Sequence, residues 1–304
     1  MFRTVIIHDD APVLLEQLGT KKKFWLDEYK LLFKEVRPST GEDWSEKVAA
    51  ELCAKLGLPH AAYELALWKG RRGVVTENFA QGEEGRRLIL GNELLFKLDP
   101  RYPEKEKRRV RQHTVRKVLA VASLEGVNPP IGFKPSQGIE TAADVFVGYL
   151  MLDAWIANQD RHHENWGLVL LTKEKTVHLA PSFDHASSLG PFESDAARSE
   201  RLRTKDKMHS MSAYVEKARS AFYGNEPSNK PLSTIYAFLA AARIFPEAAL
   251  AWIKRLEGLP TAEVESIFSE MPEDRMSVTS KEFARSILSL NRYRLLDCVR
   301  VLLK

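Results

Sequence analysis

The chain has 304 residues, of which 44% are hydrophobic and 28% charged, a composition ordinary for a water-soluble globular protein. This length allows one large domain or two lobes with separate cores. Lys and Arg total 45 and Asp and Glu 41, so the net charge is +4. A basic excess this small suits an anionic small molecule such as a nucleotide, and we predict no direct nucleic-acid binding from it.

The two cysteines, Cys53 and Cys298, exclude a disulfide framework and a cysteine-based metal site. They fit a reducing compartment, so we expect a cytoplasmic protein. Residues 1–10 hold no long apolar run, and no stretch is long enough to span a bilayer. We therefore expect neither a secretory signal nor a membrane partner.

The first eighty residues show a strand-rich pattern with one helix. Turns are expected at Gly19-Thr20, at Asp27-Glu28 and over residues 70–73. Residues 43–56 carry apolar side chains at helical spacing and stop before Gly57, which predicts a helix. The segments with strand character are 5–7, 23–26, 30–36, 63–68 and 74–76.

From residue 81 onward the pattern is mainly helical. Residues 168–171 and 177–179 form the one expected hairpin, and 193–229 is polar enough to predict a flexible surface excursion. The expected helices are 104–122, 141–157 and a series over 232–304. We therefore expect an α+β protein with an N-lobe over residues 1–80 and a C-lobe over residues 81–304.

A polar segment follows the apolar helix expected at 141–157. It contains Asp160 and Asn165 five residues apart, and Asp184 comes after the hairpin. This order matches a kinase catalytic loop followed by a metal-binding aspartate. Asp160 can accept the proton of an attacking hydroxyl, while Asn165 and Asp184 offer the hard oxygen ligands that Mg²⁺ prefers.

An upstream lysine strengthens this interpretation. Any single Asp–Asn pair is more often a helix cap or a turn than a site. Lys34 lies on an expected strand, and the helix after it carries Glu46 and Glu51. Kinases hold the ATP phosphates with a strand lysine that pairs with a helix glutamate, so we expect Lys34 to pair with Glu46, with Glu51 in reserve.

Two other features are less specific. Gly19 and Thr20 precede three lysines, and backbone N–H groups at such a turn can cover phosphates, although a plain basic turn is equally compatible. His162 lies near His163, His178 and His185, but their spacing lacks the patterns typical of zinc sites. We expect His162 to orient the catalytic loop or to stabilise charge on the transferred phosphoryl group.

These motifs resemble those of the HipA-like serine/threonine kinases, the toxins of bacterial toxin–antitoxin systems and their stand-alone relatives. The likeness lies in residues 158–162 with Asn165, and in residues 179–184, where the family has L-A-P-x-(Y/F)-D. Residues 46–57 resemble the first N-lobe helix and residues 75–79 the hinge between the lobes. The resemblance covers most of residues 15–190.

The resemblance implies a two-lobed protein-kinase-like fold with a small β-rich N-lobe and a larger helical C-lobe. It implies ATP and Mg²⁺ as cofactors and a Ser/Thr hydroxyl of a protein as acceptor. Aminoacyl-tRNA synthetases are family precedents for that protein, and an antitoxin is an expected partner. The implied roles are catalytic base for Asp160, Mg²⁺ ligation for Asn165 and Asp184, phosphate binding for Lys34, and backbone contacts with adenine for Glu77 and Phe79.

The chain also departs from the family pattern. Ala80 replaces the hinge acid that meets the ribose, only Thr20 offers a hydroxyl for autophosphorylation, and the extra N-terminal subdomain of full-length toxins is expected to be missing. The spacing Asp160-Arg161-His162-x-x-Asn165 also resembles phosphatidylinositol kinases. A lipid or small-molecule kinase and a pseudokinase binding module therefore stay open. The lack of an apolar membrane-binding segment disfavours a lipid substrate, and the intact polar residues disfavour a pseudokinase.

Overall fold

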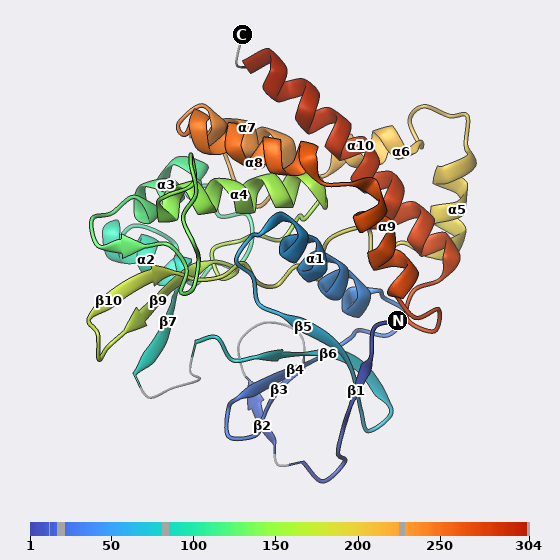
Figure 1. Ribbon diagram of the computed structural model, residues 1–304, viewed down its shortest axis with the longest axis horizontal. Coiled ribbons are helices and arrows are strands. Elements are labelled where there is room, and N and C mark those ends of the chain that lie inside the picture. Colours follow the sequence, from blue (N-terminus) through green and yellow to red (C-terminus); the bar gives the residue numbers. More distant parts are fainter. Residues whose placement is uncertain (12, 17–21, 81–84, 225–228, 303–304) are drawn as a thin grey trace.

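A six-stranded sheet forms the N-terminal part of the computed structural model, which describes residues 1–11, 13–16, 22–80, 85–224 and 229–302. The strand order is β1-β5-β6-β4-β3-β2, with β1 parallel to β5 and the other neighbours antiparallel. The strands are β1 (Thr4–Ile7), β2 (Val13–Glu16), β3 (Lys23–Leu26), β4 (Leu31–Glu35), β5 (Tyr63–Trp68) and β6 (Arg71–Glu77). Helix α1 (Glu42–Leu56) lies between this sheet and the helices of the C-terminal part (Figure 1).

The β3–β4 hairpin fixes which side chains stand together. Its turn uses three residues in the left-handed region, Asp27, Glu28 and Tyr29. The register that results places Lys23 of β3 directly opposite Lys34 of β4. Because directly opposed residues of an antiparallel pair point to the same face, both lysines are presented to the same side of the sheet.

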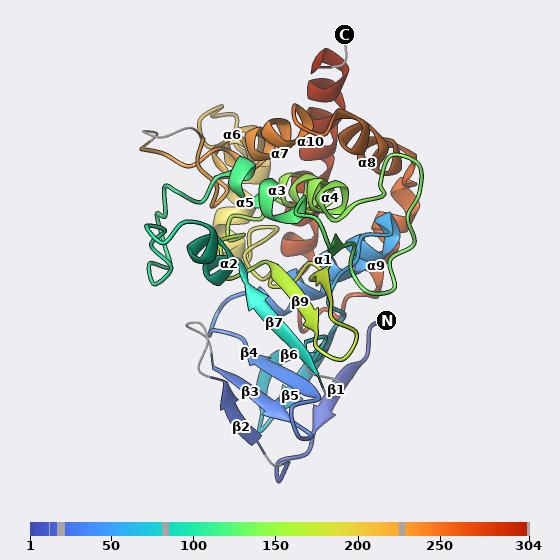
Figure 2. The same cartoon turned by 90° about the vertical axis from the view of Figure 1, so that its left-hand side faces the viewer.

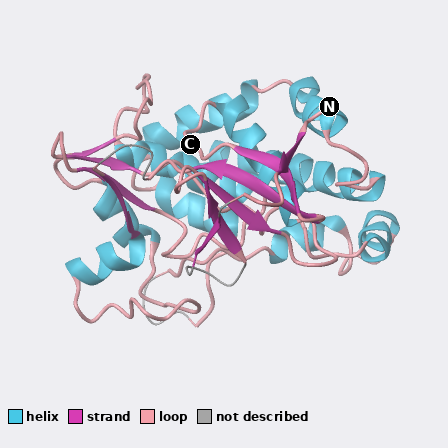
Figure 3. Cartoon of the chain, turned by 90° about the horizontal axis from the view of Figure 1, so that it is seen from below, coloured by secondary structure: helices cyan, strands magenta, loops and turns pink. Residues whose placement is uncertain are grey.

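The C-terminal part is mainly helical and contains a second, four-stranded sheet, which forms a separate group of strands (Figures 2 and 3). Its order is β7-β9-β10-β8. The strands are β7 (Arg86–Leu90), β8 (Val127–Asn128), β9 (Gly167–Leu171) and β10 (Thr176–Leu179). The helices are α2 (Gly91–Leu98), α3 (Val115–Ala122), α4 (Ala142–Trp155), α5 (Asp195–Arg203), α6 (Met211–Lys217), α7 (Thr234–Ala242), α8 (Pro246–Gly258), α9 (Thr261–Glu270) and α10 (Val278–Leu302).

Helix α4 is the centre of the C-terminal core. Every residue of it except Asp144 is buried, as expected for a helix that is apolar on all sides. Asp144 instead forms a capping box with Thr141, which fixes where the helix begins. The polar loop of residues 158–166 follows α4 directly and leads into β9, so a buried helix supports it.

The elements with clear local patterns form as predicted. These are α1, α4, the hairpin of β9 and β10, the strands β3 to β6, and the helical C-terminal series. The predicted lobe boundary at residue 80 falls between the end of β6 and the start of β7, and it stays a prediction. None of the helices within the described ranges is long and apolar enough to cross a membrane.

Two predictions were wrong. The helix expected over 104–122 is helical only in α3, because residues 105–111 hold five cations and a single apolar side chain and thus cannot form an apolar face. The flexible excursion expected over 193–229 contains α5 and α6. Arg198 anchors α5, since its buried guanidinium donates to the Ser280 hydroxyl at 2.7 Å and to the Gly190 carbonyl at 3.0 Å.

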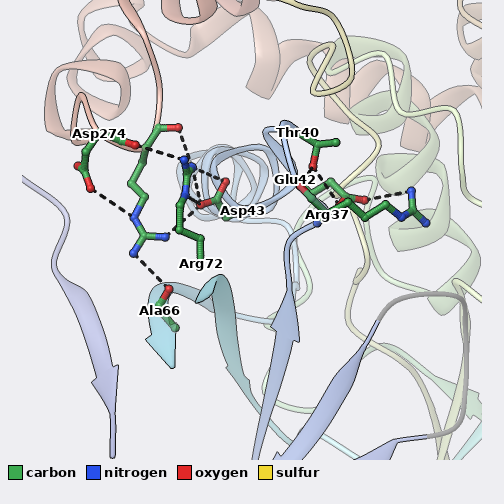
Figure 4. Close-up of polar contacts among 8 residues, drawn as sticks. Arg37, Thr40, Glu42, Asp43, Ala66, Arg72 and Asp274 are labelled. Atoms are coloured by element: carbon green, nitrogen blue, oxygen red, sulfur yellow. Dashed lines mark hydrogen bonds and ion pairs between the residues drawn. The ribbon is translucent and has the colours of Figure 1, made fainter. Parts of the chain in front are cut away.

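A buried ionic network holds the first turn of α1 (Figure 4). The carboxylate of Asp43 is fully buried and accepts from Arg72 of β6 at 2.8 Å and from Arg275 at 3.1 Å. Arg275 precedes α10, and it also donates to the Ala66 carbonyl of β5 at 3.2 Å. The network therefore ties α1 to the six-stranded sheet and to the C-terminal helices at one point.

Replacing Asp43→Asn should lower the free energy of unfolding by about 3–5 kcal/mol, because it leaves two arginines without their buried counter-ion. Urea denaturation of the variant beside the parent protein measures this loss. The matched control is Arg71→Met, which removes an ion pair with Glu35 whose arginine side chain is 53% exposed. That change should cost at most about 1 kcal/mol. Equal small effects of both substitutions would show that the network does not hold α1.

Candidate active site

A cavity of about 810 Å³ lies between the six-stranded sheet and the C-terminal part, within the size range of small-molecule sites. Its wall includes seven residues that the sequence singled out: Lys34, Glu77, Phe79, Asp160, His162, Asn165 and Asp184. Glu46 lies behind Lys34 and does not line the cavity. Gly19 and Thr20 fall outside the described residues.

Lys34 is buried where three elements meet. Its Nζ lies 3.3 Å from Glu46 Oε1 of α1, 3.5 Å from Asp184 Oδ1, and donates to the Tyr63 hydroxyl of β5 at 2.9 Å. Burial opposes the charged ammonium, but the carboxylates of Asp184 and Glu46 outweigh it and raise the pKa of Lys34 well above its usual value. Lys34 therefore keeps its positive charge. Glu51 pairs with Lys47 at 2.7 Å instead.

Asp184 receives a second lysine from the neighbouring strand. Lys23 Nζ lies 3.8 Å from Asp184 Oδ2, so two ammonium groups from opposed positions of β3 and β4 face one carboxylate. The backbone of Asp184 has a φ of 59°, a left-handed conformation that costs free energy for a residue other than glycine. The surrounding contacts must hold this segment in place.

A buried arginine holds the loop of residues 158–166, the expected catalytic loop. The guanidinium of Arg161 donates to the Asp153 carboxylate of α4 at 2.7 Å, to the Ser182 hydroxyl at 2.9 Å and to the Asn165 carbonyl at 3.2 Å. Only 1% of Arg161 is exposed. It therefore joins the end of α4, the end of the loop and the segment before Asp184 into one unit.

The functional groups of the loop point away from this buried scaffold. The side chain of Asp160 is half exposed, while its carbonyl accepts from Asn165 Nδ2 at 2.6 Å. Asn165 Oδ1 then has no hydrogen-bond partner among the described residues and can take a metal ion. His162 Nδ1 accepts from the Glu164 N–H at 3.1 Å, so neutral His162 carries its proton on Nε2, which lies 4.0 Å from Asp160 Oδ1.

The segment expected to be the hinge passes along the same cavity. Pairing between β5 and β6 ends at Tyr63 and Thr76, so the backbone of residues 77–79 is not paired with β5. The Asn78 side chain donates to the Tyr29 carbonyl at 2.8 Å and accepts from the Ala80 N–H at 3.0 Å. These bonds hold the hinge to the β3–β4 turn and occupy the amide of Ala80.

Apolar side chains complete the wall near the hinge. The rings of Phe79 and Phe183 lie 5.5 Å apart, and Leu88 and Leu90 of β7 line the cavity with them. An aromatic and aliphatic surface next to backbone that is not paired with β5 suits the flat, partly apolar ring of a purine.

Some residues of the site were missed from the sequence. Lys23 could have been found from the hairpin, since a turn at 27–30 brings position 23 opposite position 34. Tyr63, Leu88 and Leu90 carry no local signal, because strand residues of these types are common in any core.

The four clustered histidines do not form a metal site. Three of them form hydrogen bonds with separate partners. A ring nitrogen of His163 lies 2.8 Å from the Tyr102 hydroxyl, one of His178 lies 2.9 Å from the Pro129 carbonyl, and one of His185 lies 2.7 Å from the Ser182 hydroxyl. Within the described part of the chain, no three His, Cys, Asp or Glu side chains are placed to hold a metal ion.

No protein-family model and no curated protein matches the sequence. The structure, however, matches solved kinases. The proinflammatory kinase CtkA of Helicobacter pylori aligns with a TM-score of 0.73 over 98% of each chain, at 19% sequence identity. The chain has the fold of the HipA-like kinases. HipA from the toxin–antitoxin system of Shewanella oneidensis MR-1, solved with HipB and operator DNA, aligns with a TM-score of 0.59 at 13% identity, over 95% of this chain and 65% of HipA.

The HipA-like kinase fold confirms the predicted two-lobed architecture. Helix α1 carries Glu46, whose carboxylate lies 3.3 Å from Lys34 Nζ, so these two residues stand together as expected from the sequence.

His113 packs against Trp166, at the end of the loop of residues 158–166. It is buried against Phe222, with ring centroids 4.4 Å apart, and its Nε2 accepts from Trp166 Nε1 at 3.1 Å. Its Nδ1 must then carry the proton and donate to the Ala221 carbonyl, also at 3.1 Å. Burial lowers the pKa of His113 to about 3.

The free energy of unfolding should therefore fall as the pH drops below about 6.5. In that range His113 binds a proton in the unfolded state but stays neutral in the folded state. Each such group contributes roughly 1.4 kcal/mol per pH unit down to its folded pKa. Urea denaturation at pH 7.0 and 5.5 should show a smaller pH effect in His113→Gln than in the parent protein. The exposed His8→Gln serves as the control. Identical pH effects in all three proteins would contradict the assignment.

Proposed function

We propose that this chain is an ATP- and Mg²⁺-dependent serine/threonine protein kinase. The observation that carries the proposal is the convergence of Lys34, Asp160, Asn165 and Asp184 on one cavity of suitable size. The HipA-like fold supports a phosphotransferase in general, and the residues of the site supply the finer assignment.

The cavity offers partners for each part of ATP. Lys34 and Lys23 bring two positive charges to the place where phosphates would lie. The backbone of Glu77 and Phe79, which is not paired with β5, can bind the adenine edge, with Phe183 against the ring. From the sequence, Gly19 and Thr20 are proposed to cover the phosphates.

The same wall fits Mg²⁺. Asn165 Oδ1 and the carboxylate of Asp184 are hard oxygen donors, and a magnesium ion usually takes one or two such protein ligands beside waters and phosphate oxygens. When bound, Mg²⁺ would neutralise negative charge on the phosphates. With the metal present, Asp184 would share its charge between the ion and the two lysines.

The proposed reaction follows from this placement. The hydroxyl oxygen of a Ser or Thr forms a bond to the γ-phosphorus, the bond from that phosphorus to the bridging β–γ oxygen breaks, and ADP leaves. Asp160 takes the hydroxyl proton, a step that contributes typically 10²–10⁴-fold to the rate. The Nε2–H of His162, beside Asp160, can donate to an oxygen of the transferred group.

The partners of this reaction follow from likeness alone. HipA was solved with HipB, so we propose that a protein analogous to HipB binds this chain. Capture of a tagged chain from its own host would test it. An aminoacyl-tRNA synthetase as the phosphorylated protein stays a prediction from the sequence resemblance.

Asp184→Asn should reduce Mg²⁺-dependent ATP turnover by about 10²-fold or more, because it removes the charged metal ligand. Turnover is measured across a Mg²⁺ titration, with circular dichroism to confirm that the variant is folded. The control Asp206→Asn removes an exposed carboxylate far from the cavity and should keep parent activity. Unchanged turnover in the Asp184 variant would show that the metal assignment is wrong.

A further inference from the structure

A second cavity, of about 250 Å³, adjoins the first at the catalytic loop. The two cavities share five wall residues, namely Lys107, Arg108, Gln159, Asp160 and His162. Asp160 therefore stands at their junction. The larger cavity also holds Lys34 and Asp184, whereas the smaller one does not. If the nucleotide fills the larger cavity, the smaller one is the place from which an acceptor hydroxyl can reach Asp160.

The wall of the smaller cavity is positively charged. Among the residues that the structure describes, this wall carries Lys107, Arg108 and Arg109 and one carboxylate, that of Asp160. Three histidines also line it, and burial lowers the pKa of one of them, His113, to about 3, so that residue adds no charge near neutral pH.

The two arginines are available to a ligand. Lys107 faces Glu164 at 3.9 Å, but the side chains of Arg108 and Arg109 make no hydrogen bond or ion pair with any residue in the described ranges. Both are exposed. A guanidinium binds carboxylate and phosphate groups through paired hydrogen bonds, so this wall favours anions of those two kinds.

The loop that carries these cations is anchored on both sides. At its start, the Asn92 side chain donates to the Glu104 carbonyl at 3.1 Å, and buried Tyr102 contacts His163. At its end, Val110 and His113 are buried. These contacts at both ends of the loop hold the arginines beside Asp160.

We propose that the smaller cavity is the acceptor subsite and that it selects Ser/Thr segments carrying an anionic side chain next to the acceptor residue. The anion is either the carboxylate of Asp or Glu or the phosphate of an already phosphorylated residue. This inference rests on the proposed kinase function and deepens it by naming the substrate class. Arg109 is the deciding residue, because it lines only the smaller cavity, whereas Lys107 and Arg108 also line the larger one.

The test is a peptide library with one central Ser or Thr and a single varied neighbour: Ala, Lys, Asp or phosphoserine. Parent protein, Arg109→Glu and Arg111→Glu are compared by kcat/KM for the peptides and by KM for ATP. Arg111→Glu is the matched control, since it makes the same charge change on the same loop at an exposed position that lines neither cavity.

The parent protein should use anionic peptides at least about tenfold better than the Lys peptide. Arg109→Glu should lose this preference or reverse it toward the Lys peptide, with KM for ATP unchanged, while Arg111→Glu should behave like the parent. The ratio of the Asp to the phosphoserine peptide identifies which anion the subsite prefers.

Several results would overturn the inference. Equal use of Asp and Lys peptides by the parent protein, or an unchanged preference in Arg109→Glu, would contradict a subsite for anions. Neither result would contradict the proposed kinase function. ATP turnover with transfer to phosphoinositide vesicles but to no peptide would make the acceptor a lipid headgroup and sink the proposal. Absence of both ATP binding and ATP turnover would overturn the proposed function together with this subsite.

Discussion

A buried ammonium must keep its counter-charges, and in this chain that constraint joins the two lobes. Lys34 extends from the six-stranded sheet, Glu46 from α1 and Asp184 from the segment after β10. Moving Lys34 away would leave the buried carboxylate of Glu46 without its counter-charge, which costs several kcal/mol. The Asp43 network holds α1 one turn before Glu46 (Figure 4). Two separate sets of ionic contacts, at Asp43 and at Glu46, therefore fix the position of this helix. The wall of the cavity that carries Lys34 and Asp184 is thus set by the fold before any ligand binds.

In the loop of residues 158–166, some side chains are buried and hold the backbone, while others are exposed to the cavity. Arg161 is buried and satisfied by Asp153, Ser182 and the carbonyl of Asn165, and it fixes the loop between α4 and β9. Its neighbour Asp160 has a half-exposed carboxylate. Because the buried bonds hold the backbone, the reactive groups can be pre-arranged without being buried themselves. The junction of the two cavities at Asp160 follows from this division.

Local sequence patterns were enough to predict α1, α4, the hairpin before Asp184 and the importance of Lys34, Asp160, Asn165 and Asp184, since periodicity and spacing are short-range signals. Glu77 and Phe79 were expected from the family resemblance alone. They failed where distant segments decide the structure. Residues 104–113 form a loop because their cations cannot pack, and α5 is ordered because Arg198 reaches Ser280 on α10. Lys23 and Tyr63 join the site only through strand pairing. The positive charge of the smaller cavity could not be predicted, because it needs residues 107–109 beside residues 159–162 in space.

The central claim is that Asp160 directs transfer of the γ-phosphoryl group to a protein hydroxyl. The most direct test incubates the purified chain with γ-labelled ATP and Mg²⁺ in a cell lysate, beside an Asp160→Asn variant whose fold and ATP binding are checked separately. The account predicts a labelled protein band that is lost in the variant. A band of equal intensity with both proteins, or ATP turnover by the chain without label on any protein, would contradict it.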